Sequence, residues 1–314
     1  MKRFRSLMAD AALALVLAIG TTARVSATPD GQRFSSPEKA VEAFVASVRQ
    51  YDLAKLTAIF GKGSEKIFDT GDAAADQNLR TAFLKLYDEK HTITRHPDGA
   101  EILVVGKGEW PYPIPIVKAG NEWAFDTPAG FEEIINRRIG RNELDTIQTC
   151  LAIVDAQHEY YMSDPDKDAV MAYAQKFRSS PGKKDGLYWP TKPGEKASPL
   201  GEFAATAASE GYSDASPYHG YYYRMLYSQG KSAPGGAFDY MAHGKLIGGF
   251  AVVAWPASYG DTGIMTFIVN YSGAVYQKDL GPHTAEEVAK IKSFDPGPGW
   301  KKESAKDEQP LPAD

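Results

Sequence analysis

Cysteine is almost absent from this sequence of 314 residues, which contains only Cys150. A lone thiol cannot close an internal disulfide, so packed cores rather than crosslinks must stabilise the fold. A nucleophilic cysteine would require a lowered pKa, which a sequence does not reveal. Because free cysteine usually packs as a small apolar residue, we expect Cys150 on the buried face of a helix.

The sequence also lacks the short motifs that carry well-defined chemistry. It contains no G-x-S-x-G nucleophile elbow, no H-E-x-x-H zinc pair, no phosphate-binding or dinucleotide glycine loop and no C-x-x-C pair. The six histidines are scattered, and none lies four residues from another, the spacing that a zinc site on a helix prefers. We therefore expect no cofactor and favour a binding or assembly protein over an enzyme.

Positive charge is not in excess, because 35 Lys and Arg face 40 Asp and Glu. An acidic chain without a basic run is a poor candidate for binding nucleic acid or an anionic membrane surface. Beyond the N-terminal segment, no stretch approaches the run of about 20 apolar residues that spans a bilayer. We expect the partner to be an envelope protein or a glycan.

The N-terminal segment is typical of a secretory signal peptide. Residues 2–5 hold three basic side chains, residues 11–19 are apolar, and the small residues 25–27 suit a signal peptidase. Cleavage between Ala27 and Thr28 is expected, with a periplasmic or secreted product. A membrane anchor is the alternative, but the apolar run is too short to cross a bilayer.

Residues 28–126 change from a helical to a strand period and predict an N-terminal α+β domain. Ser36 and Pro37 are typical of a helix start. Pro111, followed by two further prolines of the same parity, suits an edge strand and excludes a central one. The expected order is helices and then an antiparallel meander: helices 36–48, 53–60 and 77–88, strands within 91–125.

A long helical pattern over 128–162 opens the second predicted domain, residues 127–300, and Gly140 is the position that could bend or divide it. The segment 179–219 is rich in Gly, Pro, Ser and Lys and predicts a long loop, pinned to a core by Tyr188 and its neighbour Trp189. The other expected elements are strands 221–227, 248–255, 264–270 and 274–278, a helix over 284–294, and a disordered tail over 301–314.

Five tyrosines lie close together within the segment SPYHGYYYRMLYSQG, residues 216–230. In a strand over 221–227, one face would carry Tyr221, Tyr223, Met225 and Tyr227, which is typical of a side facing a core. The alternative is a carbohydrate or peptide shelf built from Tyr218, Tyr222 and Trp189. We favour the packed strand.

Two histidines, His219 and His243, flank the same predicted strand region. Asp239 and Asp261 are not far from them in the sequence, so these groups could converge as a general acid–base set. A periplasmic hydrolase using both histidines with an acidic residue is therefore the alternative function. Polar residues at strand ends are common without catalysis, and we favour that interpretation.

Asp164, Asp166 and Asp168 occupy the first, third and fifth positions of a possible calcium loop. The sixth position is Ala169 and the twelfth is Gln175, so the sharp turn and the bidentate ligand are both missing. We favour aspartates that end one helix and begin the next. A calcium-dependent assembly module stays open as a third hypothesis.

Four segments resemble the motifs of a bacterial exported family called domain of unknown function 2950. They are KKDGLYWP, GYYYRML, GGFAVVAWPASYGDTGIMTFIVN and VYQKDLGPHT. The resemblance extends over nearly all of the mature chain. It implies an exported or periplasmic protein and brings no established activity or catalytic residues.

The order of elements in the second domain, a long helix, a loop and a small antiparallel sheet, is similar to the globular part of type II secretion pseudopilins. Some pseudopilins bind calcium in a loop, but this chain lacks their retained hydrophobic stalk, because its apolar segment is expected to be cleaved. The first domain resembles the cone fold of nuclear-transport-factor-2-like proteins, which implies a ligand cavity there. The overall expectation is an α+β fold.

Overall fold

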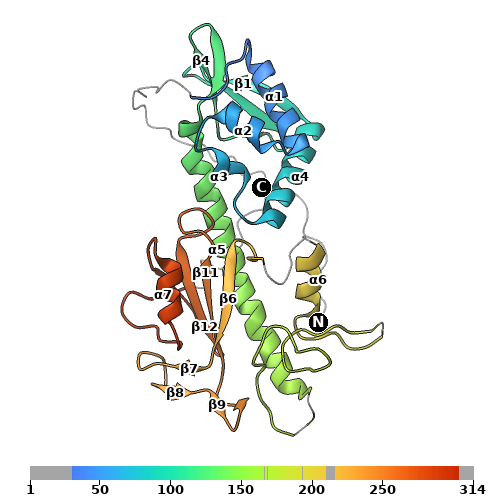
Figure 1. Ribbon diagram of the computed structural model, residues 1–314, viewed down its shortest axis with the longest axis vertical. Coiled ribbons are helices and arrows are strands. Elements are labelled where there is room, and N and C mark those ends of the chain that lie inside the picture. The colour runs from blue at the N-terminus through green and yellow to red at the C-terminus, as the bar shows by residue number, and fades with distance from the viewer. Residues whose placement is uncertain (1–29, 166, 168, 193, 210–215, 304–314) are drawn as a thin grey trace. The chain divides into compact units, whose positions relative to one another are not determined.

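The structure is a computed structural model that describes residues 30–165, 167, 169–192, 194–209 and 216–303 (Figure 1). The expected signal peptide and its cleavage site at Ala27 and Thr28 lie outside these residues. The chain divides into two compact units. Among the described residues, unit 1 holds 30–65 and 80–131, and unit 2 holds 66–79 and 132–303.

Unit 1 combines helices with an antiparallel sheet in the strand order β1-β2-β4-β5, with β3 paired to β2. The elements that contribute residues to it are α1 (Pro37–Gln50), α2 (Leu53–Phe60), α3 (Glu65–Phe68), α4 (Ala73–Glu89), β1 (His91–Arg95), β2 (Glu101–Val105), β3 (Trp110–Pro111), β4 (Ile116–Ala119), β5 (Glu122–Phe125) and the first turn of α5 (Thr127–Ser163). The predicted order of helices and then a meander is confirmed.

The first helix of unit 1 begins and packs as its sequence predicts. The hydroxyl of Ser36 accepts a hydrogen bond from the amide of Lys39, which caps α1 ahead of Pro37. Phe44, on the buried face of α1, lies 5.0 Å from the ring of Tyr112 and 5.1 Å from that of Phe60, measured between ring centroids. An aromatic cluster therefore forms the centre of this core.

Unit 2 is built around an antiparallel sheet in the order β14-β13-β12-β11-β6. Its strands are β6 (Tyr221–Leu226), β11 (Ala251–Pro256), β12 (Met265–Asn270), β13 (Val275–Asp279) and β14 (Lys301–Lys302). Four of them lie within three residues of the predicted bounds. Short pairs, β7 (Ser228–Gln229) with β8 (Phe238–Asp239) and β9 (Met241–Ala242) with β10 (Lys245–Leu246), follow β6.

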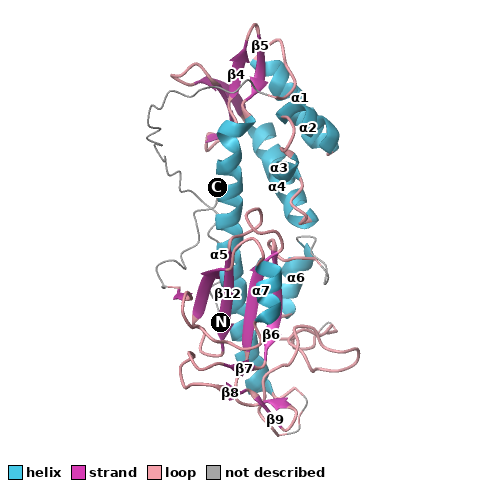
Figure 2. Ribbon diagram, turned by 60° about the vertical axis from the view of Figure 1, so that its left-hand side comes forward, coloured by secondary structure: helices cyan, strands magenta, loops and turns pink. Residues whose placement is uncertain are grey.

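The sheet of unit 2 separates two cores. Figure 2 shows α5 on one face and α7 (Thr284–Lys290) on the other. Side chains of alternate parity fill the two sides, so Val252 packs with Cys150 toward α5, whereas Val253 packs with Val288 toward α7. Cys150 is fully buried, as the sequence predicts, and α5 continues through Gly140 without a break.

The structure corrects three details of the sequence reading. The segment predicted as an unbroken loop over 179–219 contains the helix α6 (Gly201–Ser209), whose repeated alanines are strong helix formers. The tail predicted as disordered from 301 begins with β14, which pairs with β13. No helix follows Asp164 directly, because the described residues between it and α6 form turns and bridges.

The loop 257–264, which joins β11 to β12, is held by side chains of α5. Arg138 donates to a carboxylate oxygen of Asp261 at 2.7 Å, and both side chains are buried. Asn142 donates to the carbonyl of Thr262 at 2.8 Å. Glu143 accepts from two successive amides at the start of β12, both at 2.9 Å. The end of the sheet is therefore fixed to one face of α5.

The segment 66–79 belongs to unit 2, although the sequence analysis assigned it to the first domain. The same arginine, Arg138, binds this segment. Arg138 donates to the carbonyls of Lys66 and Ile67 at 2.8 and 3.0 Å. Asp72 accepts from the amide of Gly220 at 2.9 Å. Burial lowers the pKa of Arg138 and raises that of Asp76, and the attraction between the two charges opposes both shifts.

Among the helices built from described residues, none combines the length and the apolar character that crossing a bilayer requires.

Two glycines of α5 provide a matched pair of substitutions with opposite expected effects. A Cβ added to Gly140 meets open space, so Gly140→Ala should stabilise the protein by about 0.5–1 kcal/mol through helix propensity. A Cβ added to Gly130 would lie 2.4 Å from the carbonyl oxygen of Pro113, so Gly130→Ala should destabilise it. Thermal unfolding followed by circular dichroism measures both shifts, and equal signs would contradict the packing described.

Removing one partner of the buried ion pair between Arg138 and Asp261 should lower the free energy of unfolding more than removing both. Asp261→Asn leaves the Arg138 guanidinium buried without its countercharge, and a loss of about 3–5 kcal/mol is expected. The double variant Arg138→Met with Asp261→Leu should lose less than the single variant. Hydrogen-exchange mass spectrometry of β11 and β12 peptides reports the local stability. Unchanged protection in Asp261→Asn would show that the pair does not hold the loop.

Candidate functional site

Unit 2 contains a pocket of about 370 Å³ beside the strand β6. Four parts of the chain supply its walls: α5, the segment after α5, α6, and the residues from 216 to 223. Its volume lies within the range of about 300–1,000 Å³ typical of small-ligand sites. The cone resemblance implied a cavity in the first domain, whereas this pocket lies entirely in unit 2.

Seven of the fifteen described residues that line the pocket have aromatic rings. They come from the loop after α5, from α6 and from β6 with the residues before it: Phe177, Tyr188, Phe203, Tyr218, Tyr221, Tyr222 and Tyr223. The helix α6 adds only small side chains besides its phenylalanine, namely Ala204, Ala207 and Ala208. Rings on one side and methyl groups on the other leave room between them, so the site suits an apolar body.

Two tyrosines of the wall use their hydroxyls within the fold. Tyr221 donates to the carbonyl of Met265 at 3.0 Å, and the hydroxyl of Tyr223 lies 3.4 Å from that of Thr146. Burial raises the pKa of both phenols well above the usual range, so both stay neutral. Their rings, rather than their hydroxyls, are what they present to a ligand.

Arg178 is the single charged side chain among the described residues that line the pocket. It is exposed, and its guanidinium carbon lies 4.9 Å from the centroid of the Tyr188 ring. This cation–π contact holds the positive charge at the rim over an aromatic face. A ligand with an anionic group at one end would find an opposite charge there.

The two interpretations of the tyrosine segment both hold in part. Tyr221 and Met225 are buried and Tyr223 is half-buried, all facing the core under α5, as the packed-strand prediction requires. The prediction is wrong for Tyr227, which it placed on the core-facing side of the strand. The strand β6 ends at Leu226, and Tyr227 is 43% exposed.

The shelf predicted from Tyr218, Tyr222 and Trp189 is also partly realised. Tyr218 and Tyr222 line the pocket, and Tyr222 is 40% exposed. Trp189 instead packs on the core, with its ring centroid 6.4 Å from that of Tyr160. Its neighbour Tyr188 takes the place in the pocket wall. The sequence missed Phe203 because it lies in the unpredicted helix α6.

The two candidate histidines occupy equivalent turn positions. His219 and Gly220 both have positive φ and join Tyr218 to Tyr221, and His243 and Gly244 do the same between β9 and β10. Positive φ at both central residues is the pattern of a type I′ hairpin turn, and histidine is among the residues enriched there. The repeated His-Gly pair is therefore a turn signal.

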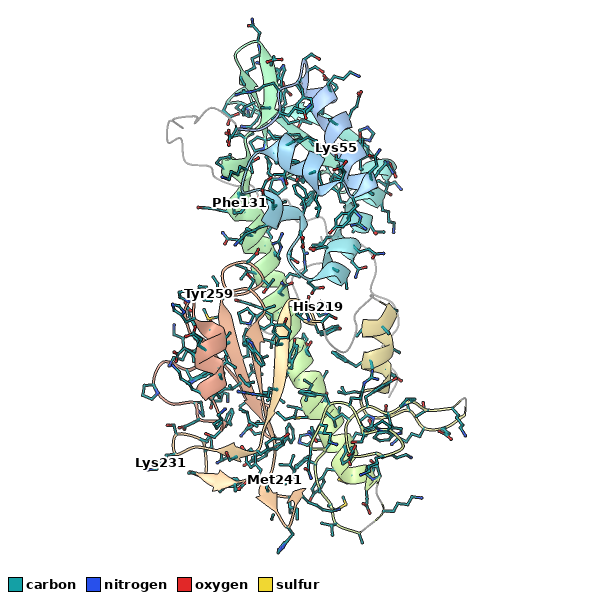
Figure 3. The ribbon with its side chains drawn as sticks, viewed as in Figure 1. Lys55, Phe131, His219, Lys231, Met241 and Tyr259 are labelled. Atoms are coloured by element: carbon teal, nitrogen blue, oxygen red, sulfur yellow. The ribbon has the colours of Figure 1, made fainter. Side chains whose placement is uncertain are left out.

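These turns keep the histidines apart, at opposite ends of β6. Figure 3 labels His219 at one end of this strand and Met241, two residues before His243, beyond the other. The six residues of β6 alone span about 20 Å. Asp239 accepts a hydrogen bond from the amide of Met241 and so belongs to the far end. The structure does not bring the proposed acid–base set together.

His219 has a different acidic neighbour, Asp145 on α5, with 3.6 Å between Nδ1 and Oδ2. Burial raises the pKa of Asp145, and the attraction of His219 opposes that shift. The ring of His219 lies 4.1 Å from that of Tyr218, measured between centroids. These contacts fix the hairpin turn against α5 and position Tyr218 in the pocket wall.

Other candidate groups offer little chemistry in the described part of the chain. Burial raises the pKa of Cys150 to about 12, so its thiol stays protonated. Asp164 accepts from the amide of Ala169 at 3.3 Å, whereas Asp166 and Asp168 lie outside the described residues. No cluster of three potential metal ligands occurs among the residues that were placed.

Comparison with known proteins gives a family but no function. No curated protein and no solved structure matches the chain, so the similarity to pseudopilins has no support. The family recognised from the sequence motifs is confirmed, because its match covers residues 31–303 and thus both units. The chain belongs to the family described as "Protein of unknown function (DUF2950)".

Proposed function

We propose that this protein is an exported binding module whose pocket in unit 2 takes a small ligand with an apolar body. The observation that carries the proposal is the aromatic wall around about 370 Å³ of space, with one charged side chain at its rim. A site of this kind gains affinity from the apolar surface that its ligand buries. It acts in the envelope by holding a ligand or a segment of a partner.

Binding is favoured over catalysis because, apart from Arg178 at the rim, the groups around the pocket are neutral or used within the fold. Tyr221 and Tyr223 are neutral phenols whose hydroxyls face other protein groups. His219 lies against Asp145 in a turn, and His243 belongs to a distant one. A hydrolase would need a nucleophile or an activated water next to a base, together with groups that stabilise negative charge.

Filling the pocket from α6 should abolish the binding of an apolar probe. N-phenyl-1-naphthylamine fluoresces when it enters an apolar site, so its titration reports occupancy. Ala204 lines the pocket, and Ala204→Trp should weaken probe binding by at least about tenfold, which corresponds to about 1.4 kcal/mol. The matched control is Ala205→Trp, since Ala205 is exposed and does not line the pocket.

The control must keep the affinity of the unsubstituted protein, and circular dichroism must show that both variants are folded. Equal probe binding in all three proteins would place the dye elsewhere and remove the pocket as its site. An absence of binding to the unsubstituted protein would contradict the proposed function directly.

Export predicts a defined N-terminus. The protein recovered from the periplasmic fraction of a Gram-negative host should begin at Thr28, as intact mass spectrometry would show. Ala27→Arg should block cleavage, because the peptidase needs a small residue there, whereas Ser26→Gln at the tolerant neighbouring position should not. Recovery of the full-length chain from the cytosol would exclude export.

A further inference from the structure

The strand β6 lies at the edge of its sheet, and its register shows which of its main-chain groups point outward. Tyr221 exchanges two hydrogen bonds with Tyr218, on the side away from β11. Gly220 is one residue earlier, and its carbonyl points the other way, because it accepts from the amide of Ala257, which follows β11. Main-chain groups alternate in direction along a strand, so those of Tyr223 and Met225 also point away from β11.

The open part of this edge extends over Tyr223 and Met225, and the pocket reaches Tyr223. On one side Tyr221 is paired with Tyr218, and on the other the carbonyl of Tyr227 accepts from the amide of Tyr240. Neither the amide nor the carbonyl of Tyr223 has a hydrogen-bond partner among the described residues. An unpaired donor and acceptor on a strand edge form a template for another extended chain.

The pocket follows this edge. Three consecutive residues, Tyr221, Tyr222 and Tyr223, line it, although successive side chains of a strand point to opposite faces. A cavity that touches all three must therefore pass around the edge of the strand rather than lie on one face. The opposite wall is α6, with Ala204 and Ala207. The site is a groove between an edge strand and a helix.

We propose that the ligand of this pocket is a short peptide in extended conformation, which adds to the outer edge of β6. The proposal rests on the binding function proposed above and names its ligand class. One residue of the peptide exchanges two hydrogen bonds with Tyr223, as in an antiparallel pair. Its side chains alternate between the two faces of the sheet, as those of β6 do, and Arg178 attracts a carboxylate at the rim.

The chemistry of the pocket favours a peptide over a sugar. A sugar ring needs several hydrogen-bond partners around its hydroxyls, whereas this wall has its two inner phenols already engaged. A peptide supplies an amide and a carbonyl spaced to meet those of Tyr223, together with apolar side chains. A purely apolar ligand would leave the two main-chain groups of Tyr223 unpaired in the groove.

A displayed library of random octapeptides, selected on the full chain, tests the proposal. The selected peptide is synthesised, and its affinity is measured by fluorescence anisotropy against the unsubstituted protein, Ala204→Trp and Ala205→Trp. We expect binding to the unsubstituted protein and to Ala205→Trp, and a loss of at least about tenfold in Ala204→Trp.

Methylation of the peptide's own amides, one position at a time, then tests strand addition. Methylation of the peptide residue that faces Tyr223 should lower the affinity of the peptide by at least about tenfold, because the N–H of that residue donates to β6. The residues on either side point their amides away and should tolerate methylation.

The possible outcomes separate this proposal from the proposed function. If N-phenyl-1-naphthylamine binds in the Ala204-sensitive pocket but no selected peptide does, the peptide is excluded and a small-molecule site remains. If peptides bind and Ala204→Trp has no effect, or if methylation shows no dependence on position, addition to β6 is overturned. If neither the dye nor any peptide binds, both the proposed binding function and the proposed peptide ligand are wrong.

Discussion

The burial of one guanidinium determines the geometry of unit 2. Arg138 is removed from water, so its charge is met by Asp261, and its two terminal nitrogens also donate to the carbonyls of residues 66 and 67. These partners come from the loop between β11 and β12 and from a distant part of the chain. Since β6 pairs with β11, fixing that loop on α5 also fixes where β6 begins and where the pocket lies.

Elements with a long, regular hydrophobic period could be predicted from the sequence. The helix α5 repeats a helical period over many residues, whereas β11 and β12 are continuous apolar runs bounded by turn signals. The helix α6 follows a stretch rich in glycine and proline and shows little amphipathic pattern. The sequence therefore predicted a loop there. The contact of Asp72 with Gly220 joins residues 148 positions apart, and no local sequence pattern could predict it.

The candidate site was harder to predict, because the same residues serve the core and the pocket. Periodicity correctly placed Tyr221 on the core-facing side, yet its ring also reaches the pocket at the sheet edge. Composition cannot separate these roles, since both favour large rings. The His-Gly pairs were misleading for a physical reason. Histidine tolerates the left-handed conformation that a type I′ turn demands, so a histidine at the end of a strand can serve the turn rather than a reaction.

An exposed strand edge is usually covered, because it can pair with other chains and aggregate. Here the helix α6 stands opposite the edge, and besides Phe203 it presents only alanines, whose methyl groups cannot fill the space beside the tyrosines. The hairpin at His219 and the amide of Tyr240 close the edge on both sides of Tyr223, so the open part is short. A short opening limits uncontrolled pairing, whereas an unfilled groove still admits one extended segment. This combination suits selective recognition better than either a sealed edge or a fully open one.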